Sequence, residues 1–246
     1  MSDVIEAIRA DRDALVEISR GLSAQQWQAT SGCPGWRVQD VVSHLATTFW
    51  AVVDRTQLPD VEGLPFEQAV EVEVQARRHL SAETVLADYE QVSGAALQQV
   101  LPAMATLDME IPMGDAGTYP AAMLPCAYAF DHYVHIRQDL FGPRGPLDGT
   151  PPPSDESRLA ATLDWIEAAL PQQNPGAVDH ATLEFVLTGP AARTIGFGSG
   201  APKGTATSDV PTFIRYITQR GTWPELGVQA SGDAPALAVA QQLRVF

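Results

Sequence analysis

The sequence predicts a two-domain α+β protein, an up-down four-helix bundle followed by a small α+β domain. Apolar residues repeat at helical spacing as far as Leu140, whereas the short alternations typical of strands occur only after residue 180. A stretch rich in proline and glycine separates the two patterns. We therefore expect a helical domain over residues 1–145, a linker over 146–153 and an α+β domain over 154–246.

The helical periodicity defines each expected element of the first domain. Pro120 suits the first turn of the last helix, because proline has no N–H to leave unpaired there. Residues 112–118 are rich in turn formers and are expected to be a loop. The expected helices are residues 4–22, 37–53, 66–80, 82–104 and 120–140.

The second domain is expected to begin with a helix capped by Ser154. Three short strands and two further helices should follow it. The expected strands are residues 183–187, 194–197 and 227–230, and the expected helices are residues 209–219 and 233–243.

Composition excludes several classes of partner. The 246 residues carry 30 acidic and 15 basic side chains, a formal net charge of −15, and contain no basic run. This balance argues against nucleic acid and anionic lipid. No apolar stretch reaches the roughly 18 residues that a membrane span needs, and the charged N-terminus does not resemble a signal peptide. We expect a cytoplasmic protein without nucleic-acid or membrane partners.

Three side chains form a candidate metal site. Asp131 and His135 are four residues apart on the last expected helix, so both lie on one face of that helix. His44 is at the edge of the apolar face of the helix over 37–53 and could supply a third ligand. Two imidazoles and one carboxylate are typical of an open site for a divalent metal. Alternatively, His44 is a core histidine, and Asp131 and His135 are a helix-surface pair.

Two motifs contain the candidate ligands: residues 33–45 have the sequence CPGWRVQDVVSHL, and residues 131–139 have the sequence DHYVHIRQD. The first is similar to the Pro-Gly-Trp motif with its histidine, and the second to the acidic-x-x-x-His segment, of the mycothiol-dependent maleylpyruvate isomerase family, which belongs to the DinB-like four-helix bundles. Residues 217–220 and 228–238 resemble the C-terminal unit of that family.

The resemblance implies a divalent metal, most often zinc, held by His44, Asp131 and His135. It implies mycothiol, the small thiol of actinobacteria, as a cosubstrate whose sulfur attacks a small electrophile in S-transfer or isomerisation. Arg220 matches the arginine expected to hold an anionic substrate. A non-catalytic metal- or ligand-binding member of the same fold is the alternative.

The chain departs from the family pattern at three positions. Asp131 stands where glutamate is usual, Arg37 stands where serine or threonine often caps the helix, and Asp139 follows His135 at +4 and not at +3. An alignment anchored on Asp139 would place His132 and Ile136 at the ligand positions. We prefer Asp131 with His135, because isoleucine cannot bind a metal, and expect His132 and Asp139 to orient the ligands.

Overall fold

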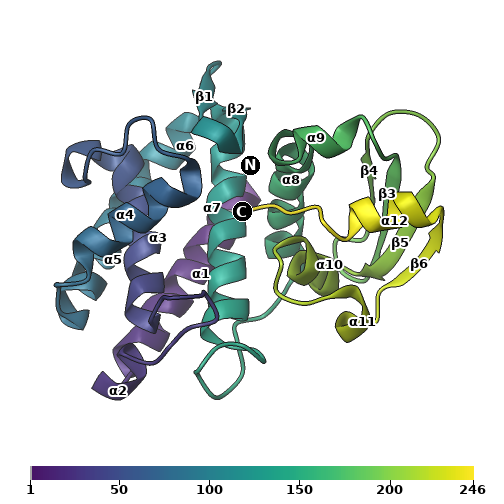
Figure 1. The fold of residues 1–246 in the computed structure, drawn as a ribbon. Helices are drawn as coiled ribbons and strands as arrows, with labels where there is room; N and C mark the ends of the chain where they lie inside the picture. The colour runs from purple at the N-terminus through teal and green to yellow at the C-terminus, as the bar shows by residue number, and fades with distance from the viewer. Residues whose placement is uncertain (1) are drawn as a thin grey trace. The chain divides into compact units, whose positions relative to one another are not determined.

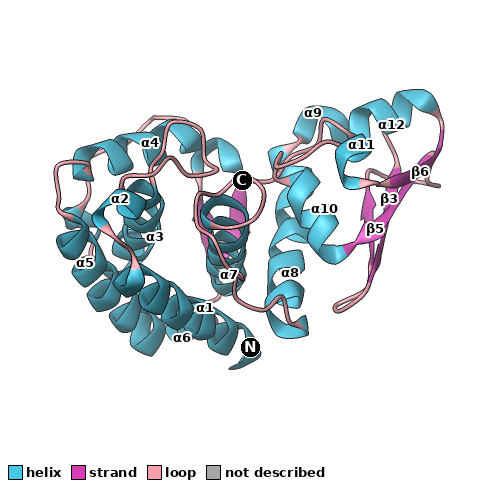
Figure 2. Cartoon of the chain, turned by 90° about the horizontal axis from the view of Figure 1, so that it is seen from below, coloured by secondary structure: helices cyan, strands magenta, loops and turns pink. Residues whose placement is uncertain are grey.

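The structure, a computed structural model that describes residues 2–246, divides into two compact units. The first runs to Asp115 and resumes over Tyr119–Pro153, and the second comprises Ala116–Thr118 and Ser154–Phe246. Figure 2 shows a bundle of helices in the first unit and helices with a sheet in the second. The predicted fold class, helical bundle plus α+β domain, is confirmed.

Four helices form the bundle of the first unit, and they run side by side in Figure 1. They are α1 (Ser2–Gly21), α3 (Val38–Val53), α5 (Ala82–Ala95) and α7 (Leu124–Val134). The shorter elements of this unit are α2 (Ala24–Trp27), η1 (Arg55–Gln57), α4 (Phe66–Arg77), which packs on α3, and η3 (Gly114–Ala116).

The two longest expected helices change their hydrogen-bonding pattern along their length. After α5, a π-helical segment η2 (Ala96–Val100) leads into α6 (Leu101–Met104). Likewise, the 3₁₀ turn η4 (Ala121–Met123) leads into α7, and α7 continues as a second π-helical segment, η5 (His135–Leu140). Single π turns inside helices are frequent at functional sites.

The helices α3 and α7 face one another across a common core, as their apolar faces predict. Phe49 of α3 stacks on Tyr128 of α7 with ring centroids 4.9 Å apart. The Tyr128 hydroxyl donates to the Thr48 carbonyl at 2.6 Å, so this phenol keeps a polar partner inside the core.

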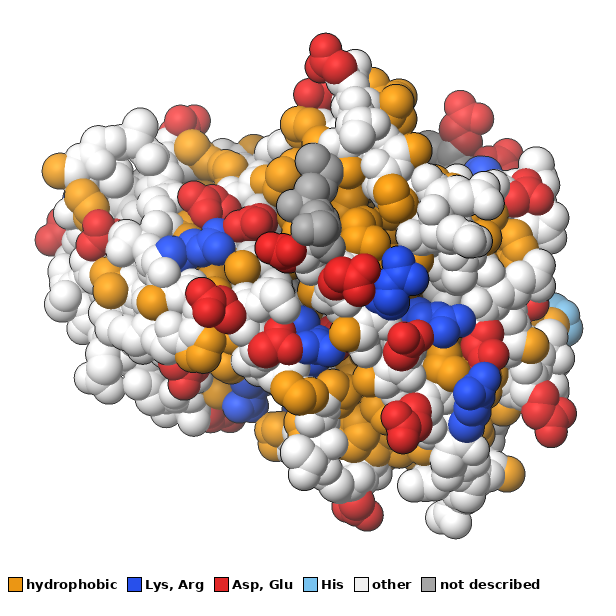
Figure 3. Space-filling view, turned by 180° about the vertical axis from the view of Figure 1, so that it is seen from behind, with side chains coloured by type: hydrophobic (Ala, Val, Ile, Leu, Met, Phe, Trp, Pro, Cys, Tyr) orange, Lys and Arg blue, Asp and Glu red, His pale blue; other side chains and the backbone are white. Residues whose placement is uncertain are grey.

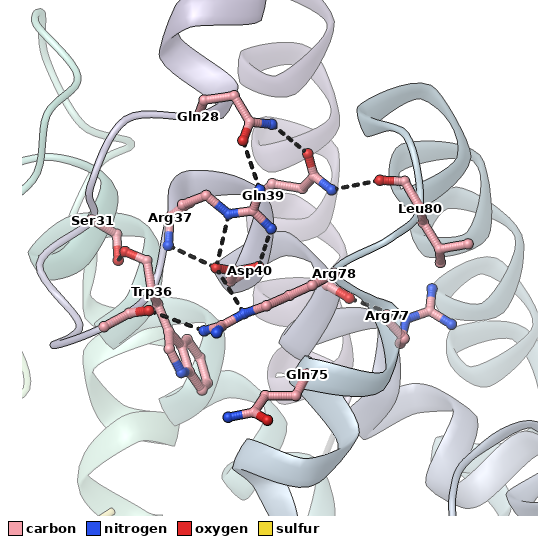
Figure 4. Close-up of polar contacts among 12 residues, drawn as sticks. Gln28, Ser31, Trp36, Arg37, Gln39, Asp40, Gln75, Arg77, Arg78 and Leu80 are labelled. Atoms are coloured by element: carbon pink, nitrogen blue, oxygen red, sulfur yellow. Dashed lines mark hydrogen bonds and ion pairs between the residues drawn. The ribbon is translucent and has the colours of Figure 1, made fainter.

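Asp40, which is 2% exposed, fixes the start of α3. Its carboxylate accepts the backbone N–H of Arg37 at 2.9 Å and also the Arg37 guanidinium, at 2.9 and 3.1 Å. Arg78, at the end of α4, approaches the same carboxylate at 3.5 Å (Figure 4). Asp40, the third residue of the helix, thus supplies the half of a capping box that accepts the N–H of the N-cap residue, while Arg37 itself provides no side-chain cap. Burial opposes ionisation of Asp40, but the hydrogen bonds and charge of Arg37 lower its pKa below the usual value.

The second unit is built on a four-stranded sheet of order β4-β3-β5-β6. The β3–β5 pair is parallel, whereas β3–β4 and β5–β6 are antiparallel. Phe185 of β3 contacts Phe213 of α10 at 5.3 Å between centroids, which places the core on this face of the sheet. The strands are β3 (Leu183–Thr188), β4 (Thr194–Phe197), β5 (Gly204–Asp209) and β6 (Gln229–Gly232). The helices are α8 (Glu156–Gln173), α9 (Pro175–Val178), α10 (Val210–Ile217), α11 (Trp223–Leu226) and α12 (Ala234–Ala240).

Three local expectations were wrong. The strand β5 was missed, because its sequence GTATSD lacks apolar alternation. Asp155, and not Ser154, is the N-cap of α8, since the Asp155 carboxylate accepts the backbone N–H of Arg158. The loop expected over 112–118 is confined to residues 113–117, because two short paired strands, β1 (Glu110–Pro112) and β2 (Thr118–Pro120), take up its ends. Pro120 is therefore at the end of a strand and not in the first turn of α7.

Within residues 2–246, no helix combines the length and the apolarity needed to cross a bilayer.

Replacing Asp40 with alanine should lower the free energy of unfolding by about 2 kcal/mol at neutral pH, because a helix cap and a buried ion pair are lost together. Since the pKa of Asp40 is lowered in the folded state, its contribution is complete above the unfolded-state value of about 4 and disappears as the pH falls through the lowered pKa. Urea denaturation curves of the two proteins should therefore converge in acid. The exposed Glu6, replaced with alanine as a control, should change stability by less than about 0.5 kcal/mol.

Candidate metal centre

The two bundle helices bring three predicted ligands together. His44 comes from α3, Asp131 from α7 and His135 from the first residue of η5. The Nε2 atoms of both histidines lie 3.2 Å from the same oxygen, Oδ1 of Asp131. One ligand atom of each residue lies within 4.8 Å of those of the other two. The predicted set is therefore one cluster, although its residues are up to 91 positions apart in sequence (135 − 44).

The two histidines of the cluster are buried, whereas the side chain of Asp131 is 21% exposed. His44 is 6% exposed and His135 is 9% exposed. Burial alone would raise the pKa of Asp131, but the charge of His44 and hydrogen bonds from both imidazoles hold it well below its usual value. Burial would lower the pKa of His135, yet Cys33, Asp131 and Asp139 hold it well above its usual value. The surroundings therefore favour an ionised Asp131 beside a protonated His135.

Asp139 sets the orientation of the His135 ring. This fully buried aspartate accepts from Nδ1 of His135 at 2.8 Å. A neutral His135 therefore carries its proton on Nδ1 and directs the lone pair of Nε2 at Asp131. The prediction that Asp139 lies behind a ligand agrees with this geometry.

The donor set fits a divalent cation. A nitrogen lone pair and a carboxylate oxygen 3.2 Å apart repel one another unless a proton or a cation lies between them. Two ligand bonds of about 2.1 Å at a tetrahedral angle separate their donor atoms by about 3.4 Å. Within residues 2–246, Oδ2 of Asp131 is buried without a hydrogen-bond partner, so this oxygen is available to bind an ion. Imidazole and carboxylate together suit zinc.

His132 belongs to the core and not to this cluster. The Tyr89 hydroxyl lies 2.9 Å from its Nε2, and the Tyr128 carbonyl lies 2.8 Å from its Nδ1. With both nitrogens bonded elsewhere, the expectation that His132 orients a ligand was wrong. Ile136 is fully buried in the core. The converging donors thus support the Asp131/His135 register over His132/Ile136.

A turn over residues 31–36 adds groups that the sequence reasoning did not assign to the site. The Trp36 ring lies 5.2 Å from the His44 ring and is stacked 6.1 Å from the His135 ring, measured between centroids. The sulfur of Cys33 lies 3.6 Å from Nδ1 of His135. The feature of the sequence that could have indicated this role is the position of the turn, directly before the helix that carries His44.

Gly32 anchors this turn to η5. Its N–H donates to the Asp139 carbonyl at 2.8 Å. A Cβ at position 32 would lie 2.8 Å from Cα of Asp139 and 2.9 Å from the Gln138 carbonyl oxygen, so this close approach requires glycine. Asp139 therefore holds His135 with its side chain and the turn with its backbone.

Arg220 lies in the second unit, just after α10. Its backbone N–H donates to the Arg215 carbonyl at 2.8 Å, and its guanidinium donates to the Thr218 carbonyl at 2.9 Å. These contacts with helix-end carbonyls are the structural role that the sequence also allows. Its role toward an anionic substrate stays a prediction.

The helical unit carries the signature of a known family. Residues 8–141 match the family described as the mycothiol maleylpyruvate isomerase N-terminal domain, and the chain belongs to this family. The chain matches no curated protein sequence.

Two solved structures resemble the whole fold. One is a mycothiol-dependent maleylpyruvate isomerase, with 16% identity and a TM-score of 0.63 over 96% of this chain and 95% of that chain. The other is a histidine-to-alanine mutant of a mycothiol-dependent maleylpyruvate isomerase, with 15% identity and the same TM-score and coverage.

Replacing Gly32 with alanine should lower the free energy of unfolding by about 1–3 kcal/mol, because the new methyl group meets backbone atoms. Chemical denaturation measures the change. Gly94 of α5 is the matched control, since a Cβ there meets nothing within 4 Å. Alanine at position 94 should raise stability by up to about 1 kcal/mol. Equal effects at the two glycines would contradict the close approach.

Proposed function

We propose that the protein is a metal-dependent enzyme that uses a small thiol, mycothiol by family, to isomerise a small electrophile or to transfer the thiol sulfur to it. The observation that carries the proposal is the convergence of His44 and His135 on one oxygen of Asp131 at 3.2 Å. Asp131 is one methylene shorter than the usual glutamate, yet it reaches both histidines. The substitution therefore leaves the three-ligand set intact.

The three ligands would hold a zinc ion and leave positions for exchangeable partners. Bound there, the ion would supply a Lewis acid that lowers the pKa of a coordinated thiol. His44 and His135 contribute neutral nitrogen donors, and Asp131 contributes one negative charge. Asp139 keeps the proton of His135 on Nδ1, which leaves Nε2 available as a donor.

The chemistry that follows uses the thiolate as nucleophile. Its sulfur adds to one carbon of an activated double bond, and the electron pair of that double bond moves onto the activating group. Rotation about the former double bond, now a carbon–carbon single bond, and return of the electron pair then expel the thiolate and form the isomerised double bond. In S-transfer, the sulfur displaces a leaving group and remains bound to carbon.

An anionic electrophile would need a local cation. The chain has a formal net charge of −15, and acidic side chains are spread over the face in Figure 3, with basic ones among them. We assign carboxylate binding to Arg220, because a guanidinium can hold a carboxylate through two parallel hydrogen bonds.

Protein purified without chelators should carry close to one zinc per chain, measured by elemental analysis. His44→Ala should lose the metal, because one of three protein ligands is removed. His79→Ala is the control, since His79 lies just after α4 and outside the cluster, and should retain the metal. A natively folded wild type that neither contains nor binds zinc would contradict the enzyme proposal and favour a non-catalytic member of the family.

Arg220→Lys should raise KM or lower kcat about tenfold for carboxylated electrophiles, because lysine cannot form the two parallel hydrogen bonds. Thiol-dependent turnover of a matched uncharged electrophile should change little. Equal losses for both substrates would mean that Arg220 serves only the end of α10.

A further inference from the structure

The two candidate histidine ligands are held in different ways. His135 has Asp139 behind its ring, at 2.8 Å from Nδ1. His44 has no such group: within residues 2–246, its Nδ1 is buried without a hydrogen-bond partner. Histidine ligands almost always use the second nitrogen to fix the ring. Something other than a hydrogen bond must therefore orient His44.

Two rings pack against His44. One belongs to the other candidate ligand, His135, which lies edge-on at 5.0 Å between centroids. The second is Trp36, at 5.2 Å between centroids and tilted by 52°. The same indole lies nearly parallel to the His135 ring, at 6.1 Å and 23°. Trp36 is only 9% exposed, so it forms an apolar wall against both imidazoles. Removing this wall would free the ring of His44 to rotate and would admit water.

The helix α4 holds this wall in place from outside. The Trp36 indole N–H donates to Oε2 of Glu71 at 2.7 Å. Arg78, at the end of α4, donates to the Gly35 carbonyl at 3.0 Å. Figure 4 shows Arg78 between Asp40 and the turn that carries Trp36. The indole thus donates a hydrogen bond from its N–H edge, and its rings pack against the rings of His44 and His135.

We propose that Trp36, anchored by Glu71, is a positioning residue that orients His44 for metal binding by packing where a hydrogen bond is lacking. The inference rests on the proposed metal centre and adds to it a dependence on α4. It predicts that metal affinity responds to Glu71, a residue outside the ligand set.

The test measures Zn²⁺ affinity by competition titration and Co²⁺ coordination by visible absorption. Trp36→Leu should weaken Zn²⁺ binding about tenfold or more, the range seen when groups behind a metal ligand are removed. Glu71→Ala and Trp36→Phe both remove the indole hydrogen bond but keep an aromatic ring at position 36. Glu71→Ala also removes contacts with Gln75 and Arg78. Both variants should weaken binding by less than about tenfold, the lower end of the range for groups behind a metal ligand. Glu71→Gln should restore wild-type affinity, because its amide oxygen also accepts. The Co²⁺ bands should shift in the three weakened variants.

Trp27→Leu is the matched control, since Trp27 is a buried tryptophan of α2 in the same unit, 6% exposed. Its Zn²⁺ affinity and Co²⁺ spectrum should equal those of the wild type. If Trp36→Leu does not fold, Trp36→Phe and Glu71→Ala decide the question. Wild-type affinity and spectrum in these variants would overturn the inference while leaving the metal centre intact. A wild type that binds neither ion would overturn the proposed function, and the inference with it.

Discussion

A carboxylate oxygen shared by two imidazoles is the constraint around which the first unit is arranged. Oδ1 of Asp131 lies 3.2 Å from both His44 and His135 in a mostly buried setting. Such a group must be neutralised by protons or by an ion, because uncompensated charge inside a protein is costly. The pairing also joins α3 to α7, so two of the four bundle helices meet at the site.

The surroundings of this cluster limit how its parts can move. Asp139 binds His135 with its carboxylate and accepts the Gly32 N–H with its carbonyl. Asp40 fixes the beginning of α3, and Arg78 connects it to the turn before that helix. The candidate ligands, the turn and α4 therefore form one hydrogen-bonded assembly, which is the kind of support that a metal ligand set would require.

Much of this arrangement was predictable from sequence, and the reasons are local. Helical periodicity located the four bundle helices, and the spacing of Asp131 and His135 placed both on one face. The partners of His44 depended on packing between helices, which periodicity alone does not define. The role of Asp139 was expected from its position, but those of Gly32 and Trp36 were not, because a turn's contacts are set by tertiary structure. The polar strand β5 was missed for the same reason, since its neighbours β3 and β6 supply its pairing.

The π-helical segment His135–Leu140 gives the spacing of the second motif a structural meaning. A π turn accommodates one residue more than an α turn, so the +4 separation of His135 and Asp139 coincides with local widening of the helix. In a relative whose histidine and aspartate are three residues apart, a regular α-helix would hold these two residues in the same positions. A sequence alignment of the two would then need its gap inside residues 136–138. A single-residue insertion can thus be accommodated in the helix that carries Asp131 and His135 without displacing the bundle, provided that the helix absorbs it as a π bulge.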